Sequence, residues 1–156
     1  MIKMFQYNWK VREEWFELCK QIPAEELVRR RVGGAGSMLY TLFHIADVEY
    51  SWVRAVQGKP DIEVDYEHYK DLARLKQLSD GWKAEVREFL KSWNPEDEEI
   101  IVTVPWSEER YTQGEILRHV IAHEIHHMGQ MSLWARELGF EPVSANVIGR
   151  ECNGLI

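Results

Sequence analysis

The hydrophobic residues of this chain recur with the period of an α-helix over most of its length. Apolar positions spaced by three or four residues define four long stretches, at about 4–21, 37–57, 69–93 and 113–138. This spacing gathers them on one face of each helix, and such a face is buried by packing against other helices. With short connections between the stretches, the pattern predicts an all-α fold, an antiparallel four-helix bundle.

Local signals mark where these helices begin and end. Ser37 is a favourable cap for the second helix, and Gly58 follows its last residue. Thr112 and Glu115 match a capping box at the start of the fourth helix. Just before it, residues 100–106 are short and rich in β-branched side chains, so they predict one small β-hairpin and no larger sheet.

Composition and charge narrow the classes of partner. The 156 residues fit a single domain, 1–156, and carry a net charge of −7 with no basic stripe, which argues against nucleic-acid binding. No run of about 18 apolar residues is present, and the start of the chain turns polar too soon for a signal peptide. Cys19 and Cys152 lack a CxxC spacing, which favours reduced thiols. We therefore expect a cytoplasmic protein without a membrane partner.

Four of the six histidines, His119, His123, His126 and His127, lie within nine residues of the predicted fourth helix. His123 and His127 are one helical turn apart at the edge of the apolar face, whereas His119 and His126 lie nearer to solvent. Two imidazoles in this arrangement can bind a transition metal from adjacent coordination positions. The alternative is a pair of histidines at the edge of the core, hydrogen-bonded to other protein groups.

Glu124 falls near the middle of the same apolar face, where an unpaired carboxylate would be unfavourable. It can pair with an arginine, orient a metal-bound histidine, or act as a base. Residues 123–127 also match HExxH, the helix motif of zinc metalloproteases. The chain lacks the downstream histidine of the extended motif and the strands that carry substrate in such proteases.

On the second helix, periodicity places His44 away from the apolar face and favours a surface position.

Two segments together resemble a known family. Residues 39–52 (LYTLFHIADVEYSW) are similar to the second-helix motif of the DinB/YfiT-like family, and residues 117–130 (LRHVIAHEIHHMGQ) are similar to its fourth-helix motif. The resemblance covers nearly the whole chain, including the hairpin with Trp106. One departure is Met128, where family members often have arginine.

The resemblance implies a four-helix bundle, commonly a homodimer, that holds a divalent metal with three histidines. Position by position, these ligands would be His44, His123 and His127, with zinc or nickel as the expected metal. His119, Glu124, His126 and Gln130 are then candidates for proton transfer or for orienting the ligands.

Known activities in the family include S-transferases and isomerases that use low-molecular-weight thiols. We therefore expect a metal-dependent transferase or hydrolase that acts on a small molecule, such as a low-molecular-weight thiol. The alternatives are a non-catalytic metal-binding or stress-response dimer, a bundle without metal, and a zinc protease of the HExxH type.

Overall fold

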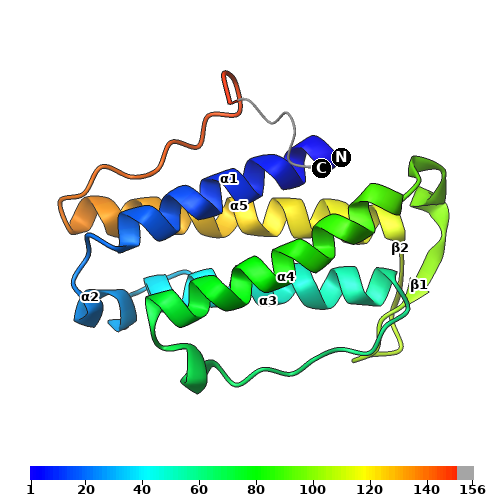
Figure 1. Cartoon of the computed structure of the whole chain (residues 1–156), viewed down its shortest axis with the longest axis horizontal. Coiled ribbons are helices and arrows are strands. Elements are labelled where there is room, and N and C mark those ends of the chain that lie inside the picture. The colour runs from blue at the N-terminus through cyan, green and yellow to red at the C-terminus, as the bar shows by residue number, and fades with distance from the viewer. Residues whose placement is uncertain (151–156) are drawn as a thin grey trace.

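The computed structural model describes residues 1–150 and shows a mostly helical protein with one small two-stranded antiparallel sheet (Figure 1). This confirms the helical class and the single hairpin. In chain order the elements are α1 (Ile2–Cys19), α2 (Ala24–Val28), α3 (Met38–Val56), α4 (Leu72–Ser92), β1 (Ile101–Thr103), β2 (Arg110–Thr112) and α5 (Gln113–Glu137), with short 3-10 helices at Tyr66–Tyr69 and Pro95–Glu99.

The four long helices enclose a common core. Helix α1 contacts α4 and α5, and α3 contacts the same two helices. The side chains that are most completely buried between them include Trp15, Phe5 and Phe16 of α1. The short helix α2 and the β-hairpin lie at opposite ends of these helices (Figure 1).

The predicted N-terminal caps of α3 and α5 are confirmed. The hydroxyl of Ser37 accepts a hydrogen bond from the backbone N–H of Tyr40, at 3.1 Å, and starts α3. Thr112 and Glu115 form the reciprocal capping box of α5. The start of α4 differs from the prediction: this helix begins at Leu72 and not near 69, because the side chain of Asp71 caps it and the preceding residues form a separate 3-10 helix.

Two further expectations concern membranes and thiols. Within residues 1–150, no helix combines the length and the apolar character needed to cross a membrane. Cys19 is a free thiol in the core, and burial raises its pKa to about 12. Cys152 lies outside the described residues.

A buried ion cluster joins three of the long helices. The guanidinium of Arg12, on α1, donates to both carboxylate oxygens of Glu124 on α5, at 2.8 and 2.6 Å. It also donates to Glu49 on α3, at 3.0 Å, and the indole N–H of Trp9 donates to the second oxygen of Glu49 at 2.9 Å. All three charged residues are at most 2% exposed. Of the roles left open for Glu124, pairing with an arginine is the one the structure shows.

The cluster is stable only as a complete set. Burial raises the pKa of Glu124, and the charge of Arg12 and its hydrogen bonds oppose that rise. Removal of the guanidinium would leave two carboxylates in the core without a counter-ion. Breaking a buried pair in this way is far more destabilising than the loss of a surface pair.

We expect Arg12→Ala to lower the free energy of unfolding by about 3–5 kcal/mol, measured by urea denaturation. The control is Lys83→Ala, which removes a partly exposed ion pair with Asp80 and should cost at most about 1 kcal/mol. Equal losses in the two variants would contradict the energetic role given to the cluster.

Candidate metal centre

Three histidines from two helices meet where α3 packs against α5. The Nε2 atom of His123 lies 3.1 Å from Nε2 of His44 and 3.1 Å from Nε2 of His127. One nitrogen from each ring can be chosen so that all three atoms lie within 4.8 Å of one another, and all three residues are half-buried. The structure therefore brings together the three residues that the family resemblance implied as metal ligands.

These distances suit a metal ion. Two nitrogen ligands at about 2.0–2.1 Å from zinc are separated by about 2.8–3.4 Å, depending on the coordination geometry. Within residues 1–150, no cysteine, aspartate or glutamate joins the three histidines. Three protein ligands are the usual number at catalytic zinc sites, where a further position is left for water or substrate.

Burial keeps the three rings neutral. It is the largest cause of the lowered pKa of His44, with His127 as the second cause. The pKa of His123 falls to about 3, through burial and then through the four other histidines around it. Burial also lowers the pKa of His127, although its hydrogen bond to Gln130 opposes the shift. Neutral imidazole is the form that binds metals, so the site needs no deprotonation near pH 7.

Gln130 orients one ligand. Its side-chain oxygen lies 2.7 Å from Nδ1 of His127, and its nitrogen lies 2.9 Å from Nε2 of His126. A carbonyl oxygen only accepts hydrogen bonds, so Nδ1 of His127 carries the proton and donates it. Nε2 of the same neutral ring then presents a lone pair to His123. This is the tautomer that binds a metal, fixed by a hydrogen bond behind the ligand.

Because the proton of His127 lies on Nδ1, its Nε2 atom cannot donate a hydrogen bond to His123. Nε2 of His123 faces two neighbours and carries at most one proton, which a single linear hydrogen bond uses. At least one of the two 3.1 Å contacts is therefore left without a linear hydrogen bond from this nitrogen. A cation bound by all three nitrogens would satisfy every contact at once, and the residues present fit such an ion.

The other candidate residues surround the three histidines in different ways. The ring of His119 lies 5.7 Å from that of His123 and is exposed. His126 is exposed and contacts Gln130. Glu124 points into the core, where Arg12 occupies both of its oxygens, so water activation by an HExxH motif would require this ion pair to break. Catalytic roles for these residues stay predictions.

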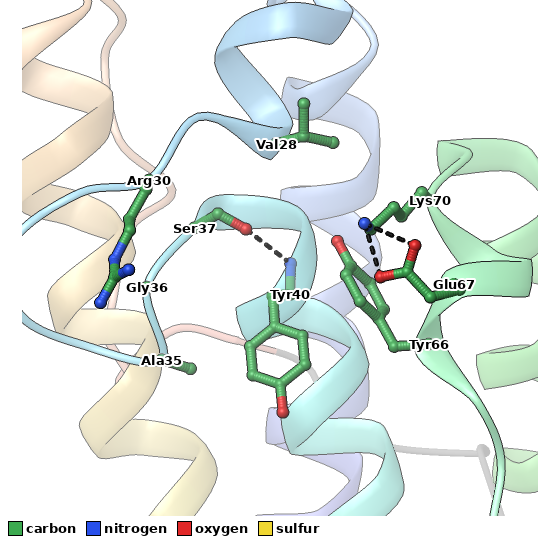
Figure 2. Close-up of a pocket in the computed structure, with 9 residues that line it drawn as sticks. All are labelled: Val28, Arg30, Ala35, Gly36, Ser37, Tyr40, Tyr66, Glu67 and Lys70. Carbon is green, nitrogen blue, oxygen red and sulfur yellow. Dashed lines mark hydrogen bonds and ion pairs between the residues drawn. The ribbon is translucent and has the colours of Figure 1, made fainter.

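A cleft of about 650 Å³ lies beside the loop that precedes α3. Figure 2 shows its lining, with Arg30 from the loop, Tyr40 from α3, and Tyr66 and Lys70 beyond it. The ring of Tyr40 stacks on that of His44, with 6.3 Å between centroids. Tyr40 therefore connects the cleft to the metal centre.

The glycine-rich loop packs against α5, which sequence reasoning missed. Gly34 has a φ of +56°, and a Cβ added to it would lie 2.6 Å from the side chain of Trp134 and 2.9 Å from the oxygen of Gln130. The Nε1 atom of Trp134 also donates to the carbonyl of Val32. Only glycine permits this approach. The loop thus lies directly beside the residue that orients His127.

The fold and the site define a class, that of helical proteins with three histidines placed to hold a metal ion. Comparison with known proteins agrees. The model of the DinB family matches residues 1–152. An uncharacterized protein of Bacillus subtilis strain 168, YizA, is 52% identical over 151 residues, which cover 96% of this chain and 95% of the YizA sequence. The chain belongs to the DinB family.

We expect the substitutions His44→Ala, His123→Ala and His127→Ala each to weaken metal binding by more than about 100-fold, because loss of a ligand exceeds the cost of about 10–100-fold for a residue behind it. The measurement is elemental analysis of protein purified without a histidine tag. His126→Ala is the matched control and should retain the metal. Loss of metal in this control, with retention in His127→Ala, would show that the ligands on α5 are wrongly assigned.

We expect Gln130→Ala to weaken metal binding by about 10–100-fold, because the proton on His127 is then no longer fixed on Nδ1. Titration with a competing chelator measures the change. Ser132→Ala is the control, since Ser132 bonds only a backbone carbonyl of its own helix. Unchanged affinity in Gln130→Ala would show that the hydrogen bond has no part in ligation.

Proposed function

We propose that this protein is a divalent-metal-dependent enzyme that acts on a small molecule, as a thiol S-transferase or a hydrolase. The observation that supports this most directly is the set of three neutral imidazoles without a fourth protein ligand among the described residues. Two cavities lie near these rings: one is lined by Tyr40, whose ring stacks on that of His44, and the other by His119, whose ring lies 5.7 Å from that of His123. Thiols are favoured as substrates by the motif resemblance described above.

The chemistry divides between the ion and the chain. A bound divalent ion acidifies a coordinated water or thiol, which makes a nucleophile available at neutral pH. His44, His123 and His127 hold the ion, and Gln130 fixes the orientation of one of them. His119 and His126 lie beside the ligands and can take up or deliver a proton, the role that histidine most often has in catalysis.

Several finer features belong to this proposal. The metal is zinc or nickel, although three imidazoles also accept cobalt or iron. The four long helices, each in contact with two others, form an antiparallel four-helix bundle. The protein is a homodimer, as family resemblance implies. A non-catalytic metal-binding protein is the competing function, and it differs in having no substrate-dependent chemistry.

Thiol transfer to monochlorobimane tests the enzyme function. In this reaction a sulfur–carbon bond forms, a carbon–chlorine bond breaks, and chloride and the thiol proton are released. We expect the zinc- or nickel-loaded protein to accelerate the reaction of cysteine or 2-mercaptoethanol, detected by fluorescence. The metal-free protein and His123→Ala should show only the uncatalysed rate.

The outcomes separate the proposals. Stoichiometric metal without acceleration of this or of ester hydrolysis would favour the non-catalytic protein. Absence of stoichiometric metal in the untagged wild type would count against both.

A further inference from the structure

A small aromatic pocket lies on the hairpin side of the metal centre. Its volume is about 200 Å³, and its walls are Trp52 of α3, Tyr111 of β2, and Glu115, Ile116 and His119 of α5. The pocket thus joins three elements, and its residues come from positions up to 67 apart in the chain. None of its five residues is one of the three candidate metal ligands.

Trp52 is the centre of this pocket. Its ring meets three others edge to face, Trp106 at 4.8 Å, Tyr111 at 5.8 Å and His119 at 5.5 Å between centroids. Trp106, from the loop of the hairpin, is 44% exposed. Trp52 and Tyr111 are partly buried against the core, and the faces and edges that such rings leave open are well suited to pack against another ring.

The pocket is within reach of the metal centre. His119 forms one of its walls and lies one helical turn before the ligand His123, with 5.7 Å between the rings. Trp52 lies two turns after the ligand His44 on α3. At about 1.5 Å per residue, the pocket begins roughly 6 Å and ends roughly 12 Å from the ligands along these helices. A molecule held at the metal can therefore place a side group here.

The polar groups of the pocket do not favour a charged occupant. Glu115 is the one carboxylate of the lining, and its Oε2 accepts hydrogen bonds from the backbone and hydroxyl of Thr112 in the cap of α5. In contrast, the larger cleft beyond Tyr40 contains Arg30 and Lys70. The two sides of the metal centre thus differ in chemistry, with the apolar character on the hairpin side.

We infer that this pocket binds one aromatic ring of the substrate while the reactive group of the same molecule reaches the three histidines. The inference rests on the proposed function and specifies its substrate class, an arylalkyl compound such as an arylalkyl thiol. The size agrees, because a cavity of about 150 Å³ accepts benzene. A ring in the pocket would face Trp52 and Tyr111 and be close to His119.

Binding of thiols to the cobalt-loaded protein tests this inference, with the sulfur-to-cobalt absorption band as the readout. The probes are 3-phenylpropane-1-thiol, whose chain is long enough for the ring to reach the pocket from a metal-bound sulfur, and propane-1-thiol. We expect the aromatic thiol to bind about tenfold more tightly or better, because its ring is removed from water. Trp52→Ala should reduce the ratio of the two dissociation constants to about the value that the thiols show without the pocket. Trp52→Phe should restore much of the ratio.

Tyr69→Ala is the control, since it removes an aromatic ring of the 3-10 helix Tyr66–Tyr69 that lines neither cavity, and it should leave the ratio unchanged. A ratio that persists in Trp52→Ala, or that is absent in wild type, overturns the inference. If neither thiol binds, 4-phenylbutanoate and butanoate form the second pair, and absence of a ring preference there overturns it too. Failure of the wild type to bind cobalt is a separate result that rejects the proposed function itself.

Discussion

The position of the three histidines depends on a charge buried behind them. Arg12 of α1 binds Glu49 of α3 and Glu124 of α5 with side chains that are almost fully buried. Glu124 follows the ligand His123 directly in sequence, and Glu49 lies five residues after the ligand His44. Because a buried charge tolerates little displacement of its partners, this cluster fixes how far α3 and α5 are shifted along each other. That shift decides whether the Nε2 atoms meet.

The HExxH pattern has a different meaning in this chain from the one it has in a zinc protease. Consecutive residues of a helix point about 100° apart, so His123 faces the half-buried metal centre while Glu124 faces the core. The two histidines of the pattern belong to the metal site, and its glutamate belongs to the ion cluster. One short motif thus supplies two residues of the candidate metal centre and one residue that joins the helices, which explains why it contains a carboxylate in the middle of an apolar face.

The sequence predicted the long helices, their caps and the hairpin well, because those depend on residues close together in the chain. It predicted that Glu124 is buried, but its partner Arg12 lies 112 residues away and has no local signal. Periodicity misplaced His44 for a related reason: a helical wheel ranks positions on one helix, whereas the surroundings of His44 are set by α5 crossing beside it. The contact of Gly34 with α5 could not be predicted either, because a glycine-rich segment indicates a flexible backbone and does not identify a neighbour.

The candidate site is built from two kinds of structure, the long helices and the segments that connect them. All three histidines and Gln130 lie on long helices, which hold them rigidly, and this suits a geometry that tolerates errors of a few tenths of an ångström. The larger cleft belongs mainly to segments at the helix ends, such as the loop before α3 with Arg30, whereas four of the five residues of the aromatic pocket lie on α3 and α5. Segments at the helix ends change without disturbing the core. The candidate metal centre and the aromatic pocket are therefore properties of the helical frame, whereas the larger cleft depends on parts of the chain that are freer to vary.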